Sequence, residues 1–259
     1  MYKLTLLTLS LVMFTQINSQ EIKVPNEARP FIIAGYEMLD YQVGDLNGDN
    51  KPDAILVLKN PGEDSLNEEE LSRTLLILIR QANGKLKQAL RNDEAIMGRH
   101  SGGVFGDPYD GITIKRNGFN ISFYGGSSWR WSYNYEFRWN AAKKNWILFK
   151  ESEANFNSGD PEKTMTEFDI EANELGEITI EKFTQGQGYE ESKWKVIAEK
   201  TFFYTNPKIG SKPRQGYLIK GDIATGTRQL KNFVEVSFEN KDGIFTSGFI
   251  LKKDMVSVK

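Results

Sequence analysis

The chain has 259 residues, with 33 Lys plus Arg against 35 Asp plus Glu, one His and no Cys. A formal charge of -2 provides no overall basic surface for nucleic acid, whose binding depends on Lys and Arg neutralising phosphates, so no nucleic-acid partner is expected. Without a thiol the chain has no disulfides, Cys nucleophile, thiolate zinc site or iron–sulfur cluster. The single His also excludes sites that need several imidazoles.

The N-terminus is typical of a secretory signal peptide. Lys3 precedes an uncharged, mainly apolar run over residues 4–14, and a polar stretch with a small residue at Ser19 follows. This run is shorter than the roughly 18 residues that a membrane-spanning helix needs, and no later run is long enough. We therefore predict a signal peptide over residues 1–19, no membrane span, and a secreted or periplasmic protein.

Most of the remaining chain is predicted to be β, with one short helix. Residues 54–58 and 74–79 are continuous apolar runs with the length of buried central strands. Between them, residues 65–72 are the best helix candidate, because Ser65 or Asn67 could cap the helix and the glutamates favour its first turn.

Turn signals predict a series of β-hairpins. Asn83-Gly84 and Asn117-Gly118 are strong signals because both residue types tolerate the positive φ of tight hairpin turns. The expected pairs join residues 112–115 to 119–124, 129–139 to 145–150, and 165–170 to 177–182. We predict that they build an antiparallel or mixed sheet in an N-terminal β-rich domain over residues 20–183.

The sharpest local signal is an ion-binding loop just before the first apolar strand. Oxygen-bearing side chains recur at positions 1, 3, 5 and 9 of the loop, which turns tightly at Gly48. Such an arrangement suits one Ca2+, which accepts six to eight oxygen ligands in adaptable geometry. The expected ligands are the side chains of Asp45, Asn47, Asp49 and Asp53 and the backbone carbonyl of Lys51. The alternative is an ordinary polar β-turn, which uses the same residue types.

This loop resembles the calcium loops of FG-GAP and VCBS-type repeats, in which D-x-[DN]-G-D-x-x-x-D joins two strands. The resemblance covers about ten residues and the strand after them, and it implies the same four side-chain ligands. It is not an EF-hand, because Asn50 stands where that loop needs Gly and Leu56 where it needs Glu. Only one copy of the motif is present, so a propeller is not predicted.

The centre of the chain is rich in glycine and aromatic residues, over 99–111 and 124–135. Its aromatic side chains and Arg130 could stack on a sugar or a peptide. His100, Ser101 and either Asp107 or Asp110 would suit a hydrolase, but no G-x-S-x-G elbow is present. The aromatic residues at odd positions from 129 to 139 share one face of a strand, and we expect that face to belong to the core.

The motifs D-x-N-G-D, G-G-V-F-G-D-P and G-G-S-S-W-R-W-S together resemble a family of secreted proteins common in Bacteroidetes. The resemblance covers residues 30 to about 160. It implies secretion, and it carries over no activity.

A C-terminal domain is predicted over residues 193–259, after a flexible linker at 184–192. Its 13 Lys plus Arg against 6 Asp plus Glu give +7, whereas the rest of the chain after residue 19 has 19 against 29, or -10. Five short strands are expected, at residues 195–198, 201–207, 216–222, 233–238 and 246–251. The segment resembles bacterial SH3 domains in its Lys-Gly-Asp and its late Ser-Gly-Phe-Ile, with Phe249 where many members have Trp. The resemblance implies a small barrel, with Phe203 and Tyr204 as candidates for contact with a ligand.

These features predict a non-catalytic binding or recognition protein of the cell envelope with one Ca2+ site. Its expected partner is a cell-wall peptide, a glycan or an envelope protein, and the basic C-terminal segment would suit an anionic polymer. Two alternatives stay open. One is a hydrolase, or an inhibitor of a hydrolase, that uses the central glycine and aromatic loops, and the other is a structural part of a surface assembly.

Overall fold

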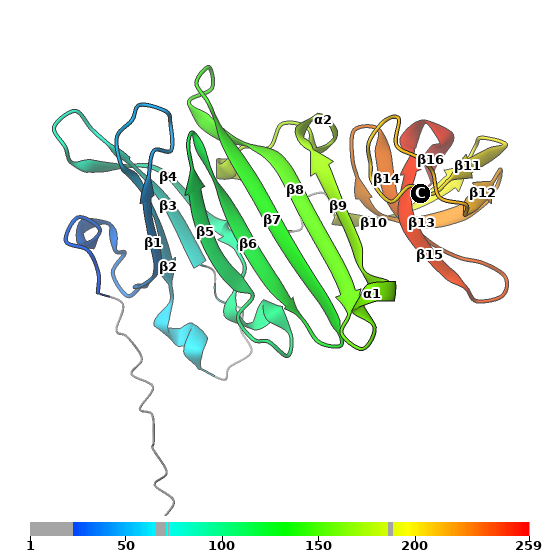
Figure 1. Ribbon diagram of the computed structural model, residues 1–259, viewed down its shortest axis with the longest axis horizontal. Helices are drawn as coiled ribbons and strands as arrows, with labels where there is room; N and C mark the ends of the chain where they lie inside the picture. Colours follow the sequence, from blue (N-terminus) through cyan, green and yellow to red (C-terminus); the bar gives the residue numbers. More distant parts are fainter. Residues whose placement is uncertain (1–22, 66–70, 72, 186–188, 259) are drawn as a thin grey trace, which may run out of the picture.

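The computed structural model describes residues 23–65, 71, 73–185 and 189–258, and it is mainly β, as predicted (Figure 1). The predicted signal peptide and most of the predicted helix at 65–72 lie outside these residues. In this part of the chain, no helix is both long enough and apolar enough to cross a bilayer.

The first sheet has the antiparallel order β1 (Glu37–Gly44), β2 (Asp53–Lys59), β3 (Arg73–Arg80) and β4 (Leu86–Ile96). The two predicted apolar runs form β2 and β3, whose residues are nearly all buried. Asn83-Gly84 lies in the turn between β3 and β4, as predicted. Short 3-10 helices flank this sheet: η1 (Arg29–Phe31) precedes it, and η2 (Pro61–Asp64) follows β2.

The second sheet has the antiparallel order β5 (Tyr109–Lys115), β6 (Gly118–Gly126), β7 (Trp129–Asn140), β8 (Asn145–Asn157) and β9 (Thr166–Glu171). Its first two predicted hairpins are confirmed, and no parallel strand pair occurs within either sheet. The 3-10 helix η3 (Arg99–Gly102) leads into this sheet from β4, and the short helix α1 (Pro161–Thr164) joins β8 to β9.

The predicted pairing of residues 165–170 with 177–182 is wrong. After β9 the chain forms the short helix α2 (Ala172–Leu175), and residues 180–182 form the 3-10 helix η4 (Ile180–Lys182). The carbonyls of Ile180 and Phe183 accept hydrogen bonds from the buried Asn92 side chain. The side chains of Ile180 and Phe183 are both buried in the main core, which this turn and its first following residue reach without forming a strand.

The main hydrophobic core lies between the two sheets. Phe119, Ile121 and Phe123 of β6 face Ile55, Val57 and Ile77 of the first sheet in one buried cluster. The odd-numbered aromatic residues of β7 point to this core, as predicted: Tyr135 and Phe137 are buried, and Trp131, Tyr133 and Trp139 pack against the cluster. Only Trp129, at the start of the strand, is largely exposed.

The C-terminal part contains a five-stranded antiparallel sheet and a two-stranded pair. The sheet order is β15 (Phe245–Leu251), β14 (Phe233–Glu239), β13 (Ile223–Gln229), β10 (Tyr189–Val196) and β16 (Met255–Val258), and β11 (Lys200–Phe202) pairs with β12 (Tyr217–Ile219). The 3-10 helix η5 (Lys252–Asp254) precedes β16. Strands β13 and β16 were not predicted, and the strand expected at 201–207 ends at Phe202. The likeness to an SH3 barrel stays a prediction.

The two parts of the chain are joined by a buried interface. Arg228 of β13 forms an ion pair with Glu151 of β8, with hydrogen bonds of 2.7 and 2.5 Å, and both side chains are almost fully buried. Beside this pair, Ile170 of β9 packs with Leu230, Phe233 and Phe249 in one apolar cluster. β10 begins at Tyr189, inside the segment predicted as a linker, and the Gln185 side chain donates a hydrogen bond to Ala95 O.

Candidate functional site

The loop between β1 and β2 brings three carboxylates together. One oxygen each from Asp45, Asp49 and Asp53 lies within 4.8 Å of the others, so this cluster could hold a metal ion. Asp53 opens β2 and is completely buried, Asp45 is half-buried, and Asp49 is exposed. The cluster is therefore accessible to solvent at Asp49 and buried at Asp53.

Backbone amides shape this loop around the carboxylates. Asp45 accepts hydrogen bonds from the N–H groups of Gly48 (2.7 Å) and Asn50 (3.0 Å), and the latter two residues have positive φ angles of 81° and 62°. Asp53 accepts from the N–H groups of Leu46 and Arg80. Such local bonds fix the two carboxylates before any ligand arrives.

The other two predicted ligands have local partners. Asn47 Oδ1 accepts a hydrogen bond from Asp49 N, and Lys51 O accepts one from Asp53 N. An amide or carbonyl oxygen has two lone pairs, so each retains the capacity to bind a cation. The Lys51 ammonium pairs with Asp49 at 3.0 Å, and both side chains are exposed enough to separate.

The electrostatics of this cluster favour a cation. Burial, together with the negative charges of Asp49 and Asp45, raises the pKa of Asp53. By contrast, hydrogen bonding to Lys51 lowers the pKa of Asp49. An ion placed among the three carboxylates would offset their mutual repulsion, whereas the single Lys51 ammonium reaches only the outermost of them.

The second sheet holds this loop from behind. Trp146 of β8 is buried and its indole Nε1–H donates a hydrogen bond of 2.7 Å to Leu46 O. Asn117 N, in the β5–β6 turn, donates to Asp45 O, and a Cβ on Gly48 would lie only 2.5 Å from the Asn117 side-chain oxygen. Gly48 thus serves both the positive φ and the close approach of this turn.

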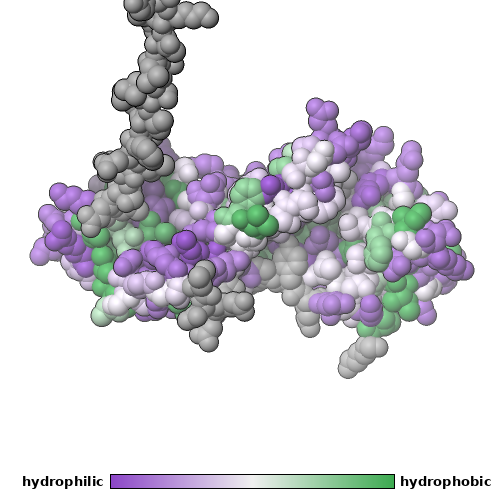
Figure 2. All heavy atoms as spheres, turned by 90° about the horizontal axis from the view of Figure 1, so that it is seen from below, coloured by the Kyte–Doolittle hydropathy of each residue, from purple (hydrophilic) through white to green (hydrophobic). Residues whose placement is uncertain are grey.

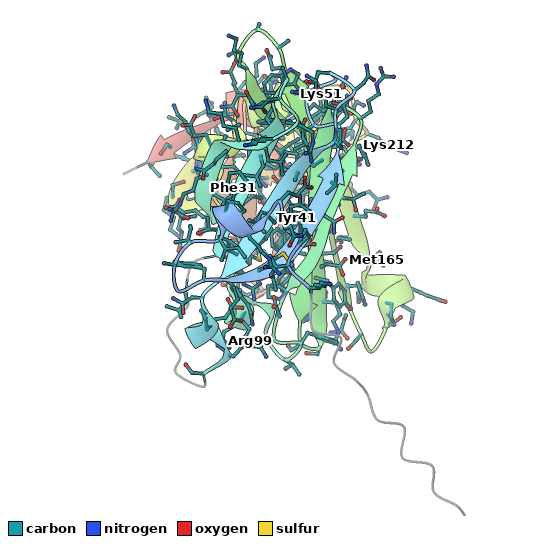
Figure 3. The ribbon with its side chains drawn as sticks, turned by 90° about the vertical axis from the view of Figure 1, so that its left-hand side faces the viewer. Phe31, Tyr41, Lys51, Arg99, Met165 and Lys212 are labelled. Atoms are coloured by element: carbon teal, nitrogen blue, oxygen red, sulfur yellow. The ribbon has the colours of Figure 1, made fainter. Side chains whose placement is uncertain are left out.

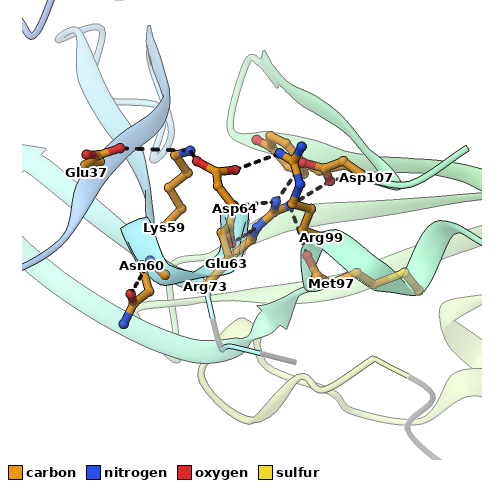
Figure 4. Close-up of polar contacts among 11 residues, drawn as sticks. Glu37, Lys59, Asn60, Glu63, Asp64, Arg73, Met97, Arg99 and Asp107 are labelled. Atoms are coloured by element: carbon orange, nitrogen blue, oxygen red, sulfur yellow. Dashed lines mark hydrogen bonds and ion pairs between the residues drawn. The ribbon is translucent and has the colours of Figure 1, made fainter. Parts of the chain in front are cut away.

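The Asp107 carboxylate, a candidate residue of the hydrolase alternative, is bound by an arginine. Arg73, fully buried on β3, binds both oxygens of Asp107 and both oxygens of the buried Glu63 (Figure 4). Burial alone would raise the pKa of Asp107. The hydrogen bonds from Arg73 outweigh this effect, so the pKa is lowered. Its carboxylate is thereby occupied by an ion-pair network that the sequence did not reveal, and His100 is exposed on η3.

The glycine-rich loop and the carboxylate loop lie far apart. Lys51 of the carboxylate loop lies near the upper end of the view in Figure 3, and Arg99, at the start of the glycine-rich segment, lies near the lower end. In the glycine-rich part of the chain, the Arg130 guanidinium lies 3.7 Å from the centre of the Phe105 ring, and Phe105 meets Tyr124 edge to face. Arg130, predicted as a stacking residue, is therefore stacked against the protein itself.

A basic hollow lies in the C-terminal part, with a volume of about 430 Å³. Its floor and wall include Tyr204, Ile209, Phe233 and Leu251, and its rim carries Lys208, Lys231, Lys252 and Lys253. Tyr204 was predicted as a ligand-contacting residue and lines this hollow. Phe203 was predicted with it, but its side chain is only 1% exposed and packs in the C-terminal core, because successive residues of an extended segment point in opposite directions.

Comparisons with protein-family models, with curated proteins and with solved structures found no match.

Proposed function

We propose that this protein is exported and acts as a non-catalytic binding protein of the cell envelope. The observation that carries the proposal is the basic hollow, which combines an apolar floor with four lysines. Ligand sites commonly have this form, a mainly apolar cavity with a few polar groups that fix orientation. The proposed ligand is an anionic component of the envelope that also presents an apolar group.

The charge distribution around the hollow supports an anionic ligand. Lys208 forms an ion pair with Glu171 at 3.3 Å, and Lys252 Nζ donates a hydrogen bond of 3.4 Å to Leu230 O. Lys231 and Lys253 are exposed and pair with no carboxylate among the described residues. Two of the four ammonium groups are thus free to meet an anion, and the exposed Ile209 beside them can cover its apolar part.

The carboxylate loop is proposed to bind one Ca2+. Three carboxylates, the Asn47 amide oxygen and the Lys51 carbonyl provide only oxygen ligands, which suit this hard cation. Ion binding would require the Lys51 ammonium to leave Asp49. The proposed role of the ion is structural, because the loop is hydrogen-bonded to the second sheet. Leu46 O accepts from Trp146, and Asp45 O accepts from Asn117.

Retention on purified envelope material tests the binding proposal. The full chain is incubated with sedimentable cell-envelope fragments at low and high salt, and the fraction retained is measured. We expect retention that falls at high salt and is lost in the charge-reversal pair Lys231→Glu and Lys253→Glu. The matched control reverses Lys241 and Lys115, which are exposed and lie outside the hollow. Equal retention of the two double variants, or none by the unaltered chain, would refute the proposal.

Thermal unfolding tests the calcium proposal. A ligand that binds only the folded state at 100 times its Kd stabilises it by about 2.7 kcal/mol. We expect a higher Tm in excess Ca2+ than in chelator, and no such difference in the double variant Asp45→Asn and Asp49→Asn. Asp242→Asn, in the exposed turn after β14, is the control and should keep the shift. If the unaltered chain has the same Tm in Ca2+ and in chelator, the calcium proposal is refuted and the loop is an ordinary polar β-turn.

A further inference from the structure

The outer face of the second sheet, opposite the core, carries an ordered set of short polar side chains. One cross-strand row contains Ser122, Asn134, Ser152 and Asp169, which are register partners on β6, β7, β8 and β9. The next row contains Tyr124, Ser132, Ala154 and Glu167. Both rows alternate along their strands with core residues such as Phe123 and Tyr135, so they point away from the core.

All residues of these two rows except Asp169 line a trough, with a volume of about 440 Å³. Its lining includes the small side chains of three serines and Ala154, together with the exposed residues Asp110, Tyr124 and Glu167. Among the described residues its lining includes the carboxylates of Asp110 and Glu167 and no Lys or Arg. It is therefore the chemical opposite of the basic hollow, and charge disfavours an anionic ligand here.

A chain of hydrogen bonds orients the polar groups of this trough. Asn120 Nδ2 donates to Asn134 Oδ1 at 2.9 Å, and Asn134 Nδ2 donates to Ser122 Oγ at 2.7 Å. The orientation of both amides is thereby fixed, and the Ser122 hydroxyl hydrogen remains available to an acceptor outside the protein. Ser152 donates to Asp169 in the same row.

One wall of the trough is aromatic. Tyr124 is 37% exposed and is supported from the side by Phe105, which in turn lies against Arg130. More exposed apolar residues occur at this end of the sheet, including Val104, Trp129 and Met165. Seen from below, the molecule has separate hydrophobic patches among hydrophilic areas (Figure 2). An apolar wall beside a polar floor suits a ligand that has both kinds of surface.

We propose that this trough binds a neutral oligosaccharide. Sugar hydroxyls donate and accept hydrogen bonds, and the floor offers hydroxyl, amide and carboxylate groups for both roles. The C–H face of a pyranose ring is apolar and can lie against Tyr124. The volume falls in the range of small-ligand sites, roughly 300 to 1,000 Å³. The site goes beyond the proposed function, since it uses neither the lysines nor the ion loop.

The test uses the full chain labelled with 15N and four neutral probes: maltohexaose, cellohexaose, xylohexaose and mannohexaose. We expect at least one probe to cause saturable amide shifts confined to β6, β7, β8 and the neighbouring ends of β5 and β9. Ser132→Arg fills the trough, and Tyr124→Ala removes its wall. Each should weaken binding at least tenfold. Thr113→Arg, exposed on the same face of β5 but outside the trough, is the control and should bind normally.

Two variants keep the test decisive if one of them fails to fold, which Tm would reveal. The inference is overturned if no probe binds at millimolar concentration, or if binding survives in the folded trough variants. The Lys231→Glu and Lys253→Glu variant should still bind the oligosaccharide, and Ser132→Arg should still be retained on the envelope through the basic hollow. A failure of either site is therefore distinguishable from a failure of the other.

Discussion

Replacing Glu153 by Gln should stabilise the protein at neutral pH and have little effect in acid. Glu153 lies on β8 at the interface between the two parts of the chain and is only 9% exposed. Its Oε1 accepts a hydrogen bond from Asn155, but Oε2 is buried without a partner among the described residues. Burial, reinforced by the charges of Glu235 and Glu151, raises its pKa from 4.5 to about 7.

The magnitude follows from this shift. A rise of roughly 2.5 pKa units corresponds to about 3 kcal/mol, at about 1.4 kcal/mol for each unit. Between pH 4.5 and 7 the folded protein holds a proton that the unfolded chain has released, so the free energy of unfolding falls as the pH rises through this window. Gln cannot ionise and keeps the oxygen that Asn155 contacts. The free energy of unfolding of the Glu153→Gln variant should therefore be about 2 to 3 kcal/mol higher than that of the unaltered protein at pH 8.

Urea unfolding of both proteins at half-unit steps from pH 4 to pH 8 measures this difference directly. Because the other ionisable groups are shared, their contributions largely cancel. The control is Glu94→Gln, an exposed carboxylate of β4, for which the difference should not change with pH. A difference for Glu153→Gln that is constant with pH, or that grows as the pH falls, would refute the reasoning.

Three further substitutions test the buried polar contacts. Arg73→Met leaves the buried Glu63 carboxylate unpaired and should cost about 3 to 5 kcal/mol in urea unfolding, part of which a second change, Glu63→Gln, should restore. Arg228→Met should cost a similar amount by leaving Glu151 without its partner, and restoration by Glu151→Gln would distinguish lost charge pairing from lost packing. Trp146→Phe removes the indole hydrogen bond to Leu46 O and should cost about 1 to 3 kcal/mol. An unchanged midpoint in any of the three would show that the contact does not contribute.

The sequence predicted best what is encoded locally. Asn83-Gly84 and Asn117-Gly118 each determine a turn through their own backbone preferences, and both hairpins were located correctly. The carboxylates of the loop at 45–53 also lie close in sequence, so their spacing was enough to bring Asp45, Asp49 and Asp53 together. Calcium itself stays a prediction.

The missed elements depend on residues that are distant in sequence. The buried positions of β13 are Ala224, Gly226 and Arg228, which show no apolar pattern. Trp194 from β10 fills the space instead, since a Cβ on Gly226 would lie 2.5 Å from its ring. The basic hollow likewise draws its lysines from three separate segments, and only the net charge of the C-terminal part pointed towards it.

The interface around Arg228 and Glu151 limits how far this protein is modular. A chain cut between β9 and β10 would give two fragments, each with a charged side chain that had been buried against the other. Each would also expose its part of one apolar cluster, which is Ile170 in the first fragment and Leu230, Phe233 and Phe249 in the second. Neither part is therefore expected to be stable alone without new residues to cover that surface, and the two parts are expected to unfold as one unit.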